Sequence, residues 1–250
     1  MSSTLALVGK ELKAVFVSPL AWVLIAIVNI IMAYIFLSHI ELYIKYQGQL
    51  AALEHAPDLS DVFISDLYSS AFALLMLITP LLTMRLLSEE LRARTIEILF
   101  AAPISNAAII VSKFVAVTLF AVILILPVFV MPLSLTIAGE LDIGVYLSAL
   151  MGVILATMAV VAIGLYISAC TAYPAMAATI SIAIILLLSI LNTVAEQGQE
   201  GELTLAYFSF SSHLAPLLKG MVSGSDIAFF LVVIVLFNVL AILRLRRWRD

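Results

Sequence analysis

Charged and apolar side chains are most closely interleaved between residues 88 and 105, a pattern suited to docking a partner. Ser88 is a residue type that caps helix starts, and the two glutamates after it suit the positive end of a helix dipole. Glu90 precedes Arg94 by four residues, the favourable order for an ion pair along a helix. Pro103 cannot continue a helix. We therefore predict a short amphipathic helix over residues 88–105, parallel to a membrane surface.

This segment suits docking better than it suits a solvated linker. Linkers rarely combine a helix cap, a helix terminator, an ion pair four residues apart and an apolar stripe. An amphipathic helix with exposed apolar groups can insert into a groove on a partner protein. The candidate docking residues are Glu89, Glu90, Arg92, Arg94, Thr95, Ile96, Glu97, Leu99, Phe100 and Pro103.

The first 18 residues carry a second amphipathic pattern. Lys10, Glu11 and Lys13 lie among apolar residues at helical spacing, so a helix here would have one apolar and one charged face. Such a helix lies in the membrane interface instead of crossing it. Pro19 follows directly and favours a sharp turn into the next segment. We predict an interfacial helix over residues 1–18.

The composition indicates which elements position these two segments. The chain has 250 residues, of which 64% are hydrophobic and 11% are charged, and its mean hydropathy is +1.23. Soluble domains are about 45–50% apolar and about 25% charged. A soluble fold of this length cannot bury the excess apolar surface, so lipid must cover much of it. The chain is therefore predicted to be an integral membrane protein.

Six apolar runs are long enough to cross a bilayer core, which takes roughly 20 helical residues. Backbone groups in lipid must pair within their own segment, so these continuous runs must be helices. The predicted fold class is all-α, a polytopic membrane protein with one transmembrane domain over residues 1–250. The predicted spans are residues 20–40, 68–87, 107–138, 145–170, 175–195 and 227–243.

Lysines and arginines are unevenly distributed between the two sides of this topology. With the N-terminus inside, ten of the twelve lie on the cytoplasmic side, and only Lys45 and Lys219 lie outside. Basic residues are enriched in cytoplasmic segments. Both termini and residues 88–105 are therefore predicted to be cytoplasmic.

The outer segment before the last span has two interpretations. Residues 203–221 are moderately apolar, but Pro216 interrupts them and they are too polar to cross a membrane. They form either a short re-entrant or interfacial hairpin, or an ordered loop that buries Tyr207, Phe208 and Phe210. The sequence leaves both alternatives open.

Several function classes are disfavoured by motifs that the sequence lacks. No Gly-rich phosphate loop with a following Lys-Ser or Lys-Thr occurs, so ATP hydrolysis by that route is excluded. The three histidines and Cys170 show no metal-ligand spacing. A net charge of −4 gives no sign of nucleic-acid binding. We expect no catalytic residue, and no cofactor or metal bound by this chain.

The candidate docking segment also resembles a known family. The similarity to the signature of ABC-2-type permeases lies in Glu89-Glu90-Leu91-Arg92-Ala93-Arg94-Thr95-Ile96-Glu97, then Ala102-Pro103-Ile104-Ser105 and Lys113-Phe114. In that family the first part reads like two Glu, two or three polar or basic residues, then Gly-Thr-Ile/Leu-Glu. Arg94 stands where the family commonly has Gly, so we expect either a different helix geometry there or a contact of Arg94 with the ATPase. The gliding-motility-type branch is the most similar.

The resemblance extends over essentially the whole chain and implies a function. It implies an N-terminal elbow helix, a coupling helix at residues 88–105 and an outer hairpin before the sixth span. It further implies a permease dimer in the inner membrane of a bacterium, paired with two cytosolic ATPase subunits that bind ATP and Mg. Movement of the coupling and elbow helices would then drive transport, and we expect export.

Two other functions are kept as alternatives. A non-transporting scaffold would pass ATP-driven motion to an accessory protein on the outer face, which the acidic outer loops would suit. A stand-alone carrier or channel usually needs ionisable groups within its spans. No Asp, Glu, Lys or Arg lies in the middle of any predicted span, which makes this last alternative the weakest.

Overall fold

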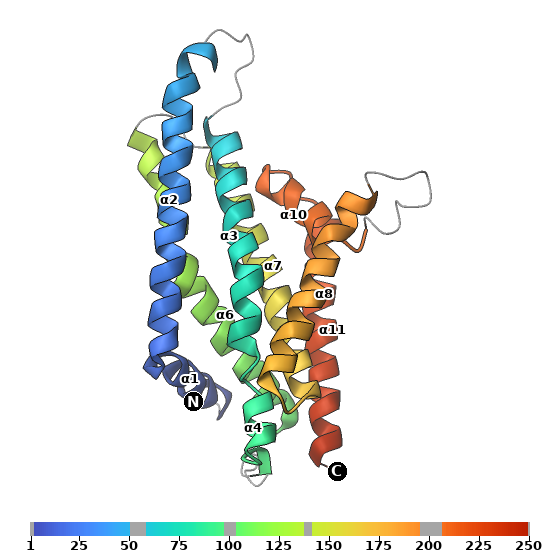
Figure 1. Ribbon diagram of the computed structural model, residues 1–250. Coiled ribbons are helices and arrows are strands. Elements are labelled where there is room, and N and C mark those ends of the chain that lie inside the picture. Colours follow the sequence, from blue (N-terminus) through green and yellow to red (C-terminus); the bar gives the residue numbers. More distant parts are fainter. Residues whose placement is uncertain (1–2, 51–58, 98–103, 138–141, 196–206, 250) are drawn as a thin grey trace.

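The computed structural model describes residues 3–50, 59–97, 104–137, 142–195 and 207–249, and within these ranges every regular element is a helix (Figure 1). The predicted all-α class is confirmed. In chain order the elements are α1 (Ser3–Val17), α2 (Pro19–Leu50), α3 (Leu59–Thr83), α4 (Ser88–Arg92), α6 (Asn106–Val130), the 3-10 helix η1 (Met131–Ile137), α7 (Ile143–Cys170), α8 (Pro174–Ala195), α10 (Phe210–Leu218) and α11 (Gly224–Arg249).

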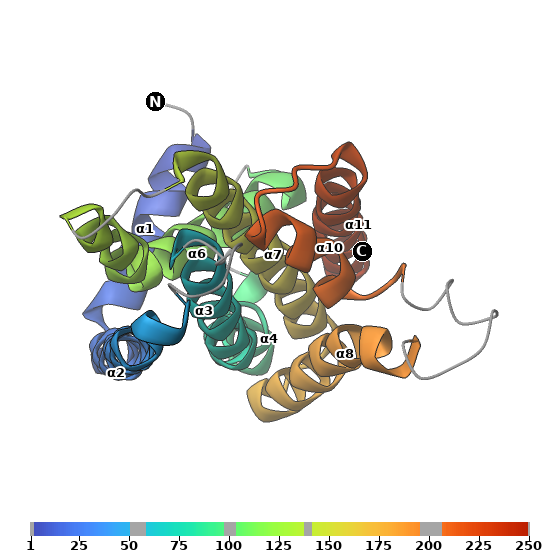
Figure 2. The same cartoon turned by 90° about the horizontal axis from the view of Figure 1, so that it is seen from above.

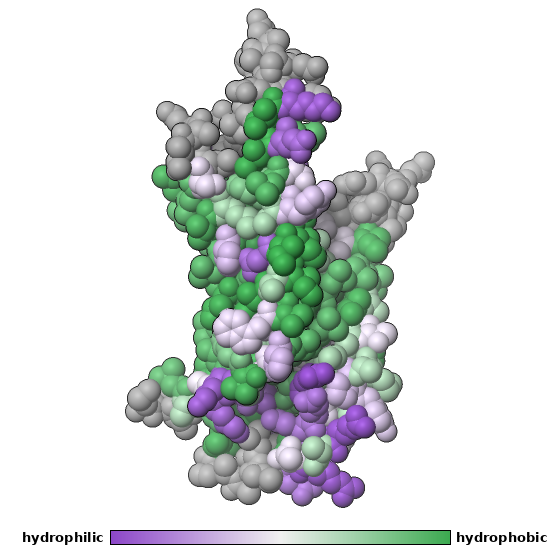
Figure 3. Space-filling model, turned by 60° about the vertical axis from the view of Figure 1, so that its left-hand side comes forward, coloured by the Kyte–Doolittle hydropathy of each residue, from purple (hydrophilic) through white to green (hydrophobic). Residues whose placement is uncertain are grey.

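Six helical stretches are long and apolar enough to cross a membrane, so the chain is an integral membrane protein. They are carried by α2, α3, α6, α7, α8 and α11, the same six regions in which the sequence predicts spans. On the face shown in Figure 3, hydrophobic residues form a broad belt across the middle of the molecule, and hydrophilic residues gather toward its two ends. This distribution is the one expected of a chain surrounded by lipid.

Several helices extend further than the predicted spans, α2 and α3 by the most, because a helix need not stop where the bilayer core stops. α2 continues to Leu50 and α3 begins at Leu59, whereas the predicted spans are residues 20–40 and 68–87. In Figure 1 the upper part of α2 rises above the other helices. The extension carries α2 beyond the apolar belt at that end.

The third span is not one α-helix over residues 107–138 as predicted. α-Helical structure ends at Val130, and the tighter 3-10 helix η1 follows it. Pro132 lies in η1 and has no N–H with which to continue the α-helical ladder. The Tyr146 hydroxyl donates a hydrogen bond to the Phe129 carbonyl at 2.8 Å, which gives one carbonyl at the end of α6 a partner.

α7 lies in the middle of the bundle, with α3, α6, α8, α10 and α11 around it (Figure 2). Small residues allow these neighbours to approach closely. A Cβ at Gly164 would overlap the Thr83 side chain of α3, and a Cβ at Gly152 would lie 2.9 Å from the Leu217 Cβ of α10. α7 is therefore the element against which the rest of the bundle is positioned.

α1 lies across one end of the bundle, next to the start of α2 and against α6 (Figures 1 and 2). Phe16 packs edge-on against Phe120 of α6, with ring centroids 5.4 Å apart. The Trp22 indole N–H donates to the Phe16 carbonyl at 3.0 Å, which fixes the turn between α1 and α2. We call the end that carries α1, α4 and the C-terminus the basic end.

α10 lies in the segment with two alternative interpretations, toward the opposite end of the bundle (Figure 1). It packs against α3, α7, α8 and α11. Phe210 is buried, whereas Tyr207 and Phe208 are both more than half exposed, so the prediction of a loop that buries all three is wrong for two of them. Residues 203–206 lie outside the described ranges, and a hairpin that enters the membrane stays a prediction.

Candidate functional site

The start of α4 is attached to the centre of the bundle through Ser168 of α7. The Ser168 hydroxyl accepts hydrogen bonds from the N–H groups of Leu87 and Ser88 at 3.1 and 3.2 Å, and it donates to the Met84 carbonyl at 3.1 Å. The first N–H groups of a helix have no partner within it, so these bonds satisfy them. The prediction that Ser88 caps this helix is wrong, because Ser88 is its first residue and donates back to the Met84 carbonyl.

α4 is shorter than predicted because the backbone leaves helical geometry at Arg94. The helix ends at Arg92, and a turn follows over residues 93–95. Within this turn Arg94 has a φ of +55°, in the left-handed region. For a residue with a Cβ this conformation costs about 1–2 kcal/mol. The single helix predicted over residues 88–105 is therefore interrupted within its described part.

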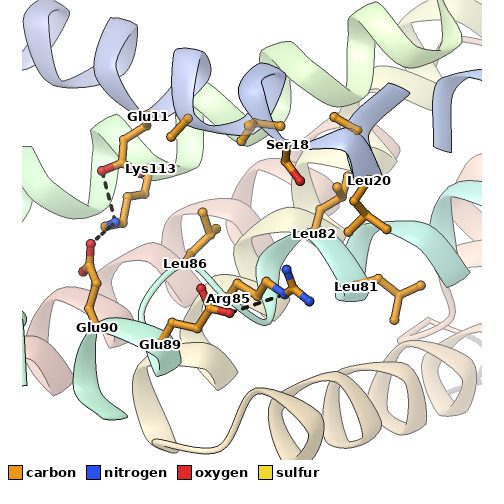
Figure 4. Close-up of a pocket in the computed structure, with 13 residues that line it drawn as sticks. Glu11, Ser18, Leu20, Leu81, Leu82, Arg85, Leu86, Glu89, Glu90 and Lys113 are labelled. Carbon is orange, nitrogen blue, oxygen red and sulfur yellow. Dashed lines mark hydrogen bonds and ion pairs between the residues drawn. The ribbon is translucent and has the colours of Figure 1, made fainter. Parts of the chain in front are cut away.

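Lys113 of α6 connects α1 and α4 through two ion pairs. Its side chain is 2% exposed, and its Nζ lies 2.7 Å from Oε1 of Glu90 and 3.1 Å from Oε1 of Glu11 (Figure 4). We call these three residues the Lys113 triad. Glu90 pairs with Lys113 and not with Arg94, so the predicted ion pair along the helix is wrong.

The Lys113 triad fastens three elements that are far apart in the sequence. A buried ammonium group is stable only when it is paired and hydrogen-bonded. The Glu11 and Glu90 side chains are 16% and 26% exposed, so water partly screens the second negative charge. Displacement of α4 from α1 would leave Lys113 with one partner fewer in a site that water scarcely reaches. The ion pairs therefore favour joint movement of α1, α4 and α6.

A cavity of about 320 Å³ lies beside the Lys113 triad, between α1, the start of α2, the end of α3 and α4 (Figure 4). A second ion pair, with Arg85 Nε 3.4 Å from Glu89 Oε1, lies on the cavity wall with both side chains about half exposed. Much of the remaining wall is apolar and comes from leucines of α2 and α3. The cavity thus combines a buried charged group, an exposed charged group and apolar walls.

The other predicted docking residues divide between surface and core. Arg92, Arg94, Thr95 and Glu97 are exposed at the basic end and accessible to a partner. Ile96 is 6% exposed and packs into the core, so the prediction that it offers an apolar group to a partner is wrong. Three further candidates lie outside the described residues, namely Leu99, Phe100 and Pro103.

Comparison with protein families shows which family the chain belongs to. A sequence model described as "ABC-2 family transporter protein" matches residues 5–248, nearly the whole chain. The chain belongs to the ABC-2 transporter family. Members of this family are membrane permease subunits that work with a separate ABC ATPase, often as dimers. No curated protein matches the chain.

In this ABC-2 permease, the residue that departs from the family pattern keeps a conformation typical of glycine. Gly adopts a positive φ without the steric penalty of a Cβ. Arg94 adopts φ +55° at the position where the resemblance has Gly. The replacement therefore retains a turn of the kind that Gly favours and adds an exposed guanidinium group next to α4.

On α1 of the permease, the three candidate residues have different environments. Lys10 and Lys13 are exposed, whereas Glu11 belongs to the Lys113 triad. In the sequence, Lys113 is notable only as part of the resemblance to the ABC-2 signature. Its position two turns into an apolar helix is a signal that could have identified it, because a lysine there needs an acidic partner.

A buried His–Asp pair, which no local sequence pattern predicts, lies toward the other end of the permease. His213 Nδ1 of α10 lies 2.7 Å from Asp226 Oδ1 of α11, and neither side chain is more than 10% exposed. Nε2 lies 2.9 Å from the Tyr207 carbonyl and donates to it, because a carbonyl oxygen can only accept. The ring stacks on Phe229 with centroids 4.1 Å apart. The pair ties α10 to the start of α11.

Among the residues that the structure describes, no three His, Cys, Asp or Glu side chains are grouped so that they could hold a metal ion. The Lys113 triad contributes two carboxylates, and a lysine occupies the space between them. The three charged groups of the triad are therefore paired with one another, and they hold α1, α4 and α6 together.

Proposed function

We propose that this ABC-2 permease is the membrane subunit of an ATP-driven exporter, moved by separate cytosolic ATPase subunits that dock on α4 and the turn after it. The observation that carries the proposal is the Lys113 triad, which connects this segment to α1 and α6. Arg92, Arg94 and Glu97 present exposed charges beside it. Docking on these charges would move α1 and α6 together with α4. ATP and Mg would bind to the partner.

The proposed orientation places the basic end in the cytoplasm of a bacterium, with the chain in its inner membrane. α11 ends in a run of arginines, and α1 and α4 carry further basic residues at the same end. Such enrichment is typical of cytoplasmic segments. Labelling of single cysteines at Lys13 and Lys219 with a membrane-impermeant reagent tests this, because only the second should react in intact cells.

A second copy or a homologous permease would cover part of the apolar surface. The spans in α2, α8 and α11 expose many large apolar side chains, which either lipid or another helix can cover. Association of helices in lipid depends on close side-chain contacts, because lipid tails are as apolar as leucine. Cross-linking of cysteines on α2 and α8 in native membranes would test for the dimer. We further propose the gliding-motility-type branch on the resemblance of the segment that contains α4.

The decisive experiment reverses exposed charges near α4 and leaves the Lys113 triad intact. We expect Arg94→Glu and Glu97→Lys to weaken copurification of an ABC ATPase and to lower the ATPase activity of the purified complex. Lys219→Glu is the matched control, because Lys219 is exposed beyond α10, away from the basic end. Normal assembly and normal activity in both basic-end variants would count against this docking site.

A non-transporting scaffold is the second candidate, and the length of α2 favours it. α2 rises above the bundle at the end opposite α4, where it could contact an accessory protein (Figure 1). In that case ATP hydrolysis would depend on the accessory protein and not on a transported molecule. Measurement of ATPase stimulation by candidate substrates and by outer-face proteins, in the same reconstituted complex, would separate the two functions.

A further inference from the structure

The cavity beside the Lys113 triad lies at the level where a lipid headgroup would meet the protein. It is bounded by the start of the α2 span, at Leu20, and by the end of α3 and the turn after it, at Leu81 and Arg85. Leu20 and Leu81 are 40% and 38% exposed, whereas Lys113 at the inner end is 2% exposed. The indole N–H of Trp22 bonds the backbone at this level, as expected of an interfacial tryptophan. The cavity therefore runs from the apolar belt toward a buried charged group.

The charges that line the cavity favour a ligand with a cationic group. Acidic residues outnumber basic ones, because Glu11, Glu89 and Glu90 face only Arg85 and Lys113. Oε2 of Glu90 is buried without a hydrogen-bond partner, although Oε1 of the same residue is bonded to Lys113. A primary ammonium group could donate to this oxygen and to Glu89. The Arg85 guanidinium, at the more exposed side, suits a phosphate.

The described residues that line the cavity also disfavour other headgroups. None of them is aromatic, and quaternary ammonium groups are bound by aromatic side chains. A purely anionic headgroup would meet a lining with an excess of negative charge. The volume of about 320 Å³ lies at the small end of ligand pockets, which span roughly 300–1,000 Å³. It is sufficient for a headgroup, and the acyl chains would lie along the apolar surface outside.

We propose that this cavity binds the headgroup of an aminophospholipid, a zwitterionic lipid with a phosphate and a primary amine, such as phosphatidylethanolamine. The ammonium group donates to Glu90 Oε2, and the phosphate accepts from Arg85. The bound lipid fills the space between α1 and α4 and thereby supports the Lys113 triad. The proposal depends only on the chain's being a membrane protein, so it stands or falls separately from ATPase docking.

Native mass spectrometry of the full, delipidated chain in detergent provides the test. The chain is titrated with phosphatidylethanolamine, phosphatidylcholine and phosphatidylglycerol that carry identical acyl chains. We expect one phosphatidylethanolamine to bind about tenfold more tightly than either of the others, since a lost charged hydrogen bond has roughly this effect. Equal binding of all three lipids, or preference for phosphatidylglycerol, would overturn the proposal. Competition by soluble phosphoethanolamine as strong as by the lipid would overturn the lipid assignment.

Two variants locate the binding site. Ala14→Phe places a ring in the cavity from α1 without changing a charge, and it should abolish the preference. Ala6→Phe is its control, because Ala6 is exposed on the same helix and does not line the cavity. Glu90→Gln can still accept a hydrogen bond from Lys113, and it should reduce the preference for phosphatidylethanolamine to about the level of the other lipids. An unchanged preference in Ala14→Phe would overturn the site, whatever the folding of the Glu90 variant.

Discussion

Nζ of Lys113 lies 2.7 Å from Oε1 of Glu90, in a site where only 2% of the lysine side chain is exposed. The same ammonium group lies 3.1 Å from Glu11, so a single side chain of a spanning helix holds both amphipathic segments of the permease. Removal of one partner from a buried ion pair is strongly destabilising, because the other charge is left without compensation.

Lys113→Met should destabilise the permease by about 3 kcal/mol, the lower part of the range for a broken buried pair, because both carboxylates are partly exposed. α1 should then exchange its amide hydrogens faster, which hydrogen-exchange mass spectrometry over residues 3–17 will measure. Lys13→Met is the control, because it removes the same charge from an exposed position. Equal effects of the two substitutions would contradict the role of the triad.

Neutralisation of the whole triad should recover much of the lost stability. In the variant Lys113→Met/Glu11→Gln/Glu90→Gln no charge remains without a partner, and neutral replacements of buried ion pairs are often tolerated. The measurement is the free energy of unfolding in a detergent titration, compared with that of Lys113→Met alone. If the triple variant is no more stable than the single one, loss of side-chain contacts and not of charge pairing explains the effect.

Substitution by glycine should affect stability differently at Arg94 and at Arg92. Arg94→Gly removes the steric penalty of the positive φ, so stability should stay the same or rise by up to about 1 kcal/mol. Arg94→Val should lower it by about 1–2 kcal/mol, because β-branched residues fit this conformation poorly. Arg92→Gly, in helical geometry, should lower it by about 0.5–1 kcal/mol. Local hydrogen exchange around α4 provides the measurement, and equal behaviour at the two positions would argue against a left-handed Arg94.

Gly164 and Gly9 form a matched pair of glycine-to-alanine substitutions. Gly164→Ala would place its Cβ against the Thr83 side chain and should destabilise the permease by about 1–3 kcal/mol. Gly9→Ala has open space around it in the middle of α1 and should stabilise that helix by up to about 1 kcal/mol. Thermal unfolding of both variants tests the close approach of α3 and α7. Addition of Thr83→Ala should recover part of the Gly164→Ala loss.

His213 and Asp226 should be more strongly coupled in energy than His39 and Asp66. A double-mutant cycle with alanine at positions 213 and 226 should give a coupling energy of about 2 kcal/mol, because the pair is buried. The second His–Asp pair, His39 and Asp66, is 3.8 Å apart with side chains 28% and 58% exposed, and its coupling should stay below about 1 kcal/mol. Similar values for the two pairs would show that burial does not strengthen the link between α10 and α11.

The six spans could be predicted because they depend on local composition. A continuous apolar run must form a helix in lipid wherever its neighbours lie. The ends of the helices were less predictable. Hydropathy does not show that α2 continues to Leu50, or that the third span changes to 3-10 geometry after Val130. Such details depend on contacts and on single backbone groups.

The candidate site could be predicted only in part, because its partners are distant in the sequence. Lys113 is 23 residues from Glu90 and 102 residues from Glu11, so no helical period relates them. A local pattern instead favoured Glu90 with Arg94, which the left-handed turn separates. The burial of Ile96 could not be predicted either, because the periodicity of a short segment does not show which of its faces packs against the bundle.

The hydroxyl of Ser168 has a mechanical consequence. It bonds three backbone groups at the junction of α3 and α4, and it belongs to the helix that all the main bundle contacts surround. A pull or push on α4 is therefore transmitted to the middle of the molecule before it reaches the lipid-facing helices. A partner that tilts α4 would therefore also displace α7, the central helix, and not only the helices on the outside of the bundle.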